Sequence, residues 1–347
     1  MSTYLDAMQP SLVLRLLLGD CRADPKDLEW SALPVLAERQ RVPLRLAECL
    51  ESRKAMVSPR FTEATAQAHA RAERVLVLLA RVADACDQHG IPYVALKIAR
   101  DFPDVGGDMD LLVSGAASGL ERVLRDLLPV VTRRRSLHHH LAGTEVYPVP
   151  EYGTVVDVHH GRLGQLGEHA RYAALLLSGR RRADFGAISC FIPSLEDQLV
   201  QQALSYGAGR PAIRLADAYW TISTVRGGRL DWELLLDTAR ATGLLPALSC
   251  HLSCVEQLHQ RLLGRPLLEP EVRRRLVQHR WGRMEFRRGS FRLTASRARA
   301  GLFFRQLQAE LKSGDWAAVG RLCLLPVVAA SVGWHRLARP FGPGDVT

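Results

Sequence analysis

Apolar residues recur at helical spacing through the first quarter of the chain. Over residues 1–58, prolines divide this pattern into short segments. After Ser58-Pro59, apolar side chains recur at i, i+3, i+4, i+7 and i+11 from Val75 to Cys86, and the pattern stops at Gly90. This spacing predicts a helical N-terminal region, followed by a long amphipathic helix with one buried face.

The pattern changes after Gly90, where short apolar runs of strand length replace the helical spacing. Strands are predicted over residues 92–97, 108–113, 137–149 and 154–159, and a helix over residues 118–128. Alternation of strands with helices indicates an α/β unit from about residue 70 to residue 190.

Beyond Pro193 the helical spacing returns and continues almost to the end of the chain. We therefore expect three parts: a helical N-terminal region over residues 1–70, an α/β core over 71–190 and an all-helical C-terminal domain over 191–347. The longest apolar run, Leu322–Trp334, contains Pro326 and is shorter than the roughly 18 residues that span a bilayer. It predicts a buried helix pair, and we expect no transmembrane segment.

Composition supports a folded protein, because 47% of the residues are hydrophobic and 24% are charged. The 7 cysteines are scattered and odd in number, which is unlike a disulfide framework. Near the N-terminus, the apolar stretch Leu12–Leu18 is broken by Arg15 and has no basic lead. These features favour a reducing, cytoplasmic location.

The net charge of +10 raises the question of nucleic-acid binding. Only four of the 46 basic residues are lysines, which is typical of a GC-rich coding sequence rather than of selection for phosphate contacts. Residues 271–300 nevertheless hold ten arginines against two glutamates. A solvated helical surface explains this stretch best, and a surface that binds a polyanion, including nucleic acid, is the alternative.

Two carboxylates lie two residues apart in the strand predicted over 108–113. Because side chains alternate faces along a strand, Asp108 and Asp110 point to one side, while Met109, Leu111 and Val113 point into the core. Like charges this close repel unless a cation neutralises them, and a hard ion such as Mg²⁺ prefers oxygen ligands. The pattern therefore suggests a metal site, although a solvated strand end would look the same.

A third carboxylate occurs in Val155-Val-Asp-Val-His159. Alternation places Val156 and Val158 on one face of this strand and Asp157 and His159 on the other. If the strand lies beside that of Asp108, three carboxylates meet and could hold two divalent ions around a triphosphate. The alternative is a hydrogen-bonded, partly exposed strand end.

These motifs and their order resemble the nucleotidyltransferase superfamily, and within it the bacterial family described as uncharacterised nucleotidyltransferase. The resemblance covers about residues 75–225 and implies an α+β fold with a small mixed sheet, flanked by helical N-terminal and C-terminal regions. The segments that carry it are Gly90-Ile-Pro-Tyr-Val-Ala-Leu-Lys97, Gly107-Asp-Met-Asp-Leu-Leu-Val113, Val156-Asp-Val-His159, Pro193-Ser-Leu-Glu-Asp-Gln-Leu199 and Arg214-Leu-Ala-Asp217.

The resemblance implies transfer of a nucleoside monophosphate from a nucleoside triphosphate, such as ATP, to an acceptor, with Mg²⁺ or Mn²⁺ as cofactor. Asp108, Asp110 and Asp157 would be the catalytic residues and the metal ligands, and Asp157 would also help to deprotonate the acceptor. Lys97 and Arg100 would contact the nucleotide.

The acceptor is not identified by the sequence: a small molecule, a peptide or protein, or RNA would each suit such a core. The arginine-rich stretch favours an anionic acceptor, and nucleic acid is not the favoured partner. His139, His159 and Asp217 are the candidates for acceptor contacts.

The sequence departs from the family pattern after Lys97. Members of this family usually have Lys-Gly there, so that bare backbone N–H groups can approach the triphosphate, but here Ile98-Ala99-Arg100 follows. A β-branched residue at this point leaves a second hypothesis open, in which the fold persists as a scaffold or binding protein that is catalytically impaired, within a biosynthetic pathway for example.

Overall fold

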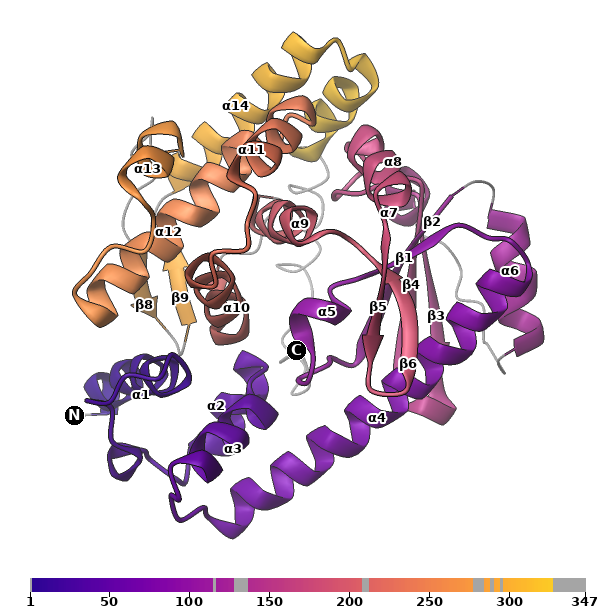
Figure 1. Cartoon of the computed structure of the whole chain (residues 1–347). Coiled ribbons are helices and arrows are strands. Elements are labelled where there is room, and N and C mark those ends of the chain that lie inside the picture. Colours follow the sequence, from indigo (N-terminus) through magenta and orange to yellow (C-terminus); the bar gives the residue numbers. More distant parts are fainter. Residues whose placement is uncertain are drawn as a thin grey trace, which may run out of the picture.

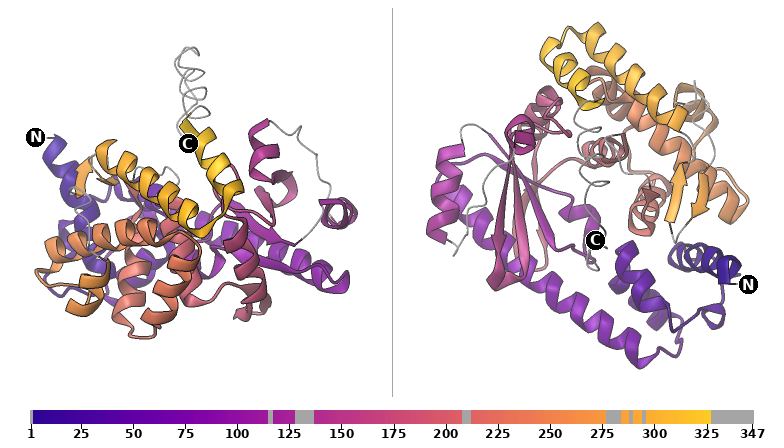
Figure 2. Two further views of the ribbon diagram at one scale, coloured as in Figure 1. Left: turned by 90° about the horizontal axis from the view of Figure 1, so that it is seen from above. Right: turned by 180° about the vertical axis from the view of Figure 1, so that it is seen from behind.

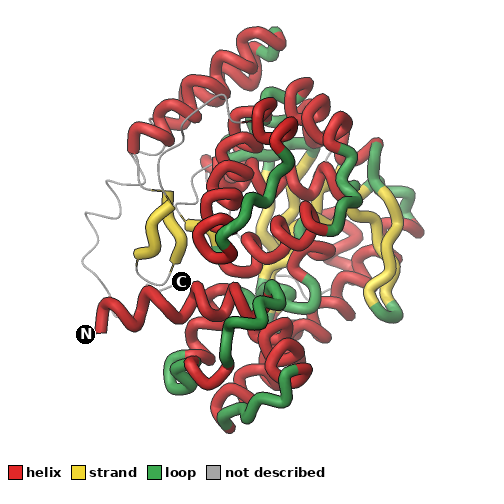
Figure 3. The backbone as a smooth tube through the Cα atoms, turned by 60° about the vertical axis from the view of Figure 1, so that its left-hand side comes forward, coloured by secondary structure: helices red, strands yellow, loops and turns green. Residues whose placement is uncertain are grey.

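The computed structural model describes residues 2–114, 117–127, 137–207, 212–276, 284–287, 290–293 and 296–326. Helices make up most of the N-terminal and C-terminal parts, while a four-stranded sheet forms the centre of the α/β part (Figures 1 and 3). The protein therefore has the α+β architecture that the sequence predicts.

The N-terminal region consists of short helices that lead into one long helix. Four prolines lie in the first turn of helical segments here, in line with the pre-set φ of proline: Pro25, Pro34, Pro43 and Pro59. Ser58 caps the long helix by accepting a hydrogen bond from the N–H of Phe61 at 3.3 Å. The elements are α1 (Ser2–Leu17), the 3₁₀ turn η1 (Pro25–Asp27), α2 (Leu33–Gln40), α3 (Pro43–Ser52) and α4 (Pro59–Gln88).

The central sheet contains four strands in the order β1-β2-β4-β3, of which β2 and β4 run parallel and the other pairs antiparallel. Helix α4 runs along it from the N-terminal helices to α6 (Figures 1 and 2). The elements of this part are β1 (Tyr93–Leu96), α5 (Ile98–Asp101), β2 (Asp108–Val113), α6 (Ala117–Leu127), α7 (Leu137–Ala142), β3 (Thr144–Val149), the 3₁₀ turn η2 (Pro150–Tyr152) and β4 (Thr154–His160).

The two faces of this sheet belong to two different hydrophobic cores. Met109, Leu111, Val156 and Val158 pack with α4 and α6 in one core, as the alternation in the sequence predicts. On the other face, side chains that include Val94 join a core shared by the N-terminal and C-terminal helices. Because apolar residues cover both faces, the polar side chains within β2 and β4 need a separate explanation.

The part of the chain after β4 begins with a helix and a two-stranded hairpin, which packs against β1 and α4, and continues as helices with a three-stranded sheet. Its elements are α8 (Ala170–Ser178), β5 (Arg181–Phe185), β6 (Ile188–Ile192), α9 (Leu195–Gly207), β7 (Ala212–Ile213), α10 (Leu215–Arg226), α11 (Trp232–Ala241), α12 (Leu245–Leu263), α13 (Pro270–Leu276), β8 (Met284–Arg287), β9 (Ser290–Leu293) and α14 (Ser296–Ser313). Residues 316–326 are also helical.

Two sequence predictions are corrected by the structure. Residues 137–142 form helix α7 and not the first half of a strand, so that only Thr144–Val149 pairs with β4. The C-terminal domain is not all helical, because β7, β9 and β8 form a three-stranded sheet. In both places the segment is short and lacks a clear period, so neighbouring elements decide its conformation.

The longest apolar run, Leu322–Trp334, falls mostly outside the described residues, and its described part is helical. Among the described helices, none combines the length and the apolar character needed to cross a membrane. The domain boundaries 1–70, 71–190 and 191–347 stay a prediction.

Candidate metal and nucleotide site

The parallel pairing of β2 with β4 brings two carboxylates together. Asp110 is aligned with Asp157, while Asp108 is aligned with Val155. Asp110, Asp157 and His159 each offer one ligand atom, and these three atoms lie within 4.8 Å of one another. The structure thus forms an Asp-Asp-His group that could hold a metal ion.

Lys97 and His159 lie beside Asp110, whose side chain is only 6% exposed. The Lys97 ammonium donates a hydrogen bond to Oδ2 of Asp110 at 2.5 Å, and Nε2 of His159 lies 3.6 Å from Oδ1. Burial alone would raise the pKa of Asp110, but Lys97 and His159 outweigh it and hold this pKa well below the usual range. Asp110 is therefore ionised and ready to bind a cation.

The pKa of Asp157 is shifted in the opposite direction to that of Asp110. Burial raises the pKa of Asp157, and the charge of Asp110 adds to this rise, while His159 opposes it. Its Oδ1 is buried and has no hydrogen-bond partner among the described residues. Leaving a buried carboxylate oxygen without a partner costs free energy. A bound cation would give Oδ1 of Asp157 such a partner.

The donor set fits a divalent cation. Two carboxylates suit Mg²⁺ or Mn²⁺, whereas the imidazole of His159 is a ligand that transition-metal ions accept more readily than Mg²⁺ does. The group differs from the predicted set of three carboxylates, because His159 takes the place of Asp108.

Asp108 lies on the same face of β2 but is engaged with the N-terminal region. The guanidinium of Arg41 donates a hydrogen bond to Oδ1 of Asp108 at 3.0 Å and lies 3.7 Å from Asp101. Gly106 leaves room for the guanidinium in this position, since a Cβ there would lie 2.1 Å from Nη1 of Arg41. Nothing in the local sequence around Arg41 marks it as a neighbour of the site, because the contact spans 67 residues.

The turn after β1 is built without a glycine. Lys97 itself adopts the left-handed conformation, with φ 66°, and Ile98 begins the short helix α5. Non-glycine residues rarely adopt this conformation, which costs about 1–2 kcal/mol. The geometry gives Lys97 its reach to Asp110, and helix α5 occupies the place where the family pattern has a glycine.

Arg100 and Asp217 belong to a buried network beside the site. Arg100 is 3% exposed, and its Nε lies 3.3 Å from Asp101 and 3.8 Å from Asp217. Gln202 donates a hydrogen bond to Asp217 at 3.2 Å. Neither Arg100 nor Asp217 lines the cavity at the carboxylates, and both connect α5 with the C-terminal helices.

His139 lies on α7, which packs against the edge strand β3, and is not among the residues that line the cavity. His159 is the one acceptor candidate that the structure places at the carboxylates.

A cavity of about 400 Å³, within the range of small-ligand pockets, opens at Asp110 and His159, while Asp108 and Asp157 are not among the residues that line it. Sequence reasoning missed the part of its wall formed by the loop after β4 and by α9. The loop is held by Glu168, whose carboxylate accepts hydrogen bonds from the N–H groups of Gln165 and Leu166. The cavity is lined by Leu96, Lys97, Asp110, His159, Leu163, Gly164, Gln165, Gln201, Leu204 and Ser205.

The family model for uncharacterised nucleotidyltransferases matches residues 26–260, which is more than half of the chain. The chain belongs to this family. The match extends further in both directions than the motifs noted in the sequence, so the family segment also includes Arg41. No curated protein and no solved structure matches the chain.

Proposed function

We propose that the protein transfers a nucleoside monophosphate from a nucleoside triphosphate to an acceptor, with Mg²⁺ or Mn²⁺ bound at the carboxylates. The observation that carries this proposal is the alignment of Asp110 with Asp157, next to a cavity large enough for a small ligand that Asp110, Lys97 and His159 line, within a chain of the nucleotidyltransferase family.

Asp110 and Asp157 would hold the metal, with His159 or Asp108 completing the donor set. A bound divalent ion would neutralise the phosphates and polarise the α-phosphoryl group. The protein's own part is to orient the triphosphate: the Lys97 ammonium is a point charge on a short turn at the cavity wall, and it can move from Asp110 to a phosphate oxygen.

In the reaction, an oxygen of the acceptor forms a bond to the α-phosphorus, and the bond to the pyrophosphate leaving group breaks. The proton of the acceptor passes to a base at the site, for which the carboxylate of Asp157 and the imidazole of His159 are the available groups. In-line positioning and charge neutralisation supply most of the rate enhancement of such transfers.

The experiment uses triphosphates labelled at the α-phosphate, incubated with the full chain and Mn²⁺ or Mg²⁺ in the presence of small-molecule, peptide and RNA fractions. We expect label in one fraction, and loss of at least 100-fold in the rate for Asp110→Asn and Asp157→Asn. Asp184→Asn, which removes an exposed carboxylate of β5, serves as the matched control. Equal transfer by Asp157→Asn would remove this residue from the mechanism.

A catalytically impaired scaffold is the second candidate function. It is supported by the glycine-free turn at Lys97 and by the engagement of Asp108 with Arg41 and of Asp110 with Lys97. A thermal-shift measurement separates the two: a ligand at 100 times its dissociation constant stabilises by about 2.7 kcal/mol. No shift with any of the four triphosphates and Mn²⁺ would favour the scaffold.

A further inference from the structure

A second and larger cavity lies between α8, the turn from α11 to α12, and α14. Its volume is about 570 Å³, and it is lined by Arg171, Arg240, Ala241, Gly243, Leu245, Pro246, Arg305, Gln308, Ala309, Lys312 and Ser313. None of these residues lines the cavity at the carboxylates, so this is a separate place in the fold.

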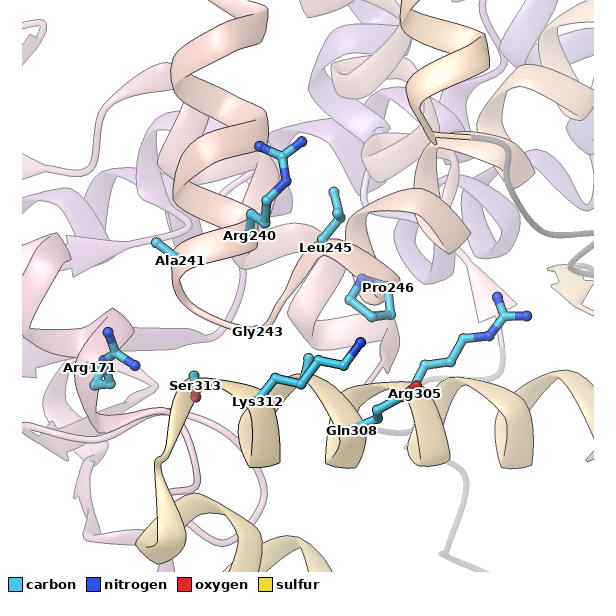
Figure 4. Close-up of a pocket in the computed structure, with 11 residues that line it drawn as sticks. Arg171, Arg240, Ala241, Gly243, Leu245, Pro246, Arg305, Gln308, Lys312 and Ser313 are labelled. Carbon is cyan, nitrogen blue, oxygen red and sulfur yellow. The ribbon is translucent and has the colours of Figure 1, made fainter.

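Four of the lining residues are cationic and none is acidic. Figure 4 shows Arg305 and Lys312 on α14, and Arg171 and Arg240 on the elements across from it. Like charges that share one cavity repel one another, and an anion between them removes that repulsion. The charge pattern therefore points to an anionic ligand.

The carboxylates near this cavity leave part of its charge unbalanced. Asp237 pairs with Arg240 at 2.6 Å on the exposed surface of α11. Glu310 is buried and faces the imidazole of His169, with 3.6 Å between Oε1 and Nδ1. Within the described ranges, no acidic residue forms an ion pair with Arg171 or Lys312.

The walls of the cavity are fixed by close packing. At Gly243, which has φ 71°, a Cβ would lie 2.5 Å from Oε1 of Glu310, so only glycine lets the α11–α12 turn approach α14 this closely. Ser313 donates a hydrogen bond to the carbonyl of Glu310 at 2.9 Å and closes the end of α14. A ligand would thus meet a preformed cavity.

The first turn of α12 adds to the positive potential. Leu245 and Pro246 line the cavity and begin a helix of 19 residues that has no side-chain cap at its N-terminus. Pro246 has no N–H to donate, so the contribution of this end is mainly that of the helix dipole, which favours an anion. This contribution supports the four side chains and does not stand alone.

From this cavity and its charges we infer that it binds a small molecule carrying two or more phosphate groups. Arginine and lysine are the side chains that bind phosphate in proteins, and the cations lie on opposite walls, which suits a ligand with several anionic groups. The volume is that of a small-ligand pocket. This inference does not depend on the proposed metal site or on transferase activity.

The test is calorimetric titration of the full chain with inorganic triphosphate, in the absence of divalent cations and at low ionic strength. We expect saturable binding that weakens at least tenfold in Arg171→Ala/Lys312→Ala. The matched control Lys26→Ala/Arg60→Ala removes the same two charge types from exposed positions and should bind like the parent protein. Titration with ATP under the same conditions, in competition, shows whether a nucleoside triphosphate uses this cavity.

Hydrogen–deuterium exchange of the parent protein provides a second readout that needs no variant. Triphosphate should protect residues 240–247 and 305–313. Absence of saturable binding, equal weakening in the control, or binding that survives Arg171→Ala/Lys312→Ala but is lost in Lys97→Met would each overturn the inference, the last by placing the anion at the carboxylates.

Discussion

Replacing Lys97 by Met removes the ammonium group that faces the buried carboxylate of Asp110. The two groups are 2.5 Å apart, and the side chains of Lys97 and Asp110 are 17% and 6% exposed. Met keeps most of the volume of the lysine stem, so the main change is the loss of the charge. What remains is a buried carboxylate with Nε2 of His159 at 3.6 Å from its Oδ1.

The expected loss of unfolding free energy in Lys97→Met follows from the burial of the Lys97–Asp110 pair. Breaking a buried ion pair from one side typically costs about 3–5 kcal/mol. Because this pair borders a cavity that water can enter, we expect a loss of stability at or just below this range, about 2–3 kcal/mol, for Lys97→Met at pH 7. The double variant Lys97→Met/Asp110→Asn should be more stable than Lys97→Met, because it leaves no uncompensated charge.

The contribution of the Lys97–Asp110 pair to stability depends on pH. The pKa of Asp110 is below its ordinary value of 3.8 in the folded protein, so the pair contributes its full stability above about pH 4 and loses it as the pH falls. The difference in unfolding free energy between the parent and Lys97→Met should therefore shrink as the pH falls below about 4.

Urea unfolding of the parent, the two single variants and the double variant gives the coupling energy of the pair, with Lys26→Met as a control for an exposed lysine. We expect a coupling above about 1.5 kcal/mol. A Lys97→Met variant within 0.5 kcal/mol of the parent, together with additive single effects, would refute this reasoning.

Further predictions concern Arg41 and His251. Arg41→Ala should tighten Mn²⁺ binding several-fold in an electron paramagnetic resonance titration, because it removes the guanidinium that neutralises Asp108. Gly106→Ala should also tighten Mn²⁺ binding, because its Cβ would displace that guanidinium. Unchanged Mn²⁺ affinity in both variants would contradict this prediction. Burial lowers the pKa of His251 to about 4, so its contribution to stability is complete above pH 6.5 and declines as the pH falls toward 4, by up to about 3 kcal/mol. His251→Gln should show a shallower loss of unfolding free energy over this range, and an unchanged slope would refute it.

Which face of the sheet each side chain of β2 and β4 lies on could be predicted from the sequence, because side chains alternate between the two faces along a strand. Met109, Leu111 and Val158 pack in one core, and Asp157 and His159 point away from it, as predicted. The pairing of these strands is different, since it depends on the topology of the whole sheet, and it could be expected only from the family resemblance.

The remaining parts of the site depend on contacts between distant segments. Arg41 reaches Asp108 across 67 residues, and no periodicity or motif near Arg41 marks it. The wall formed by Gln201 on α9 depends on where that helix packs, which local propensity does not determine. Arg100 and Asp217 were predicted to contact the nucleotide and the acceptor, and in the structure they lie close to each other in a buried network. The sequence does not distinguish an arginine that binds a ligand from one that joins helices.

The central claim is that Asp110 and Asp157 together bind a divalent cation. It is tested most directly by titrating Mn²⁺ into the full chain and measuring free Mn²⁺ by electron paramagnetic resonance, for the parent, Asp157→Asn and the control Asp184→Asn. The account predicts saturable binding by the parent and by Asp184→Asn, and affinity at least tenfold weaker for Asp157→Asn. Equal Mn²⁺ affinity in all three proteins would contradict it.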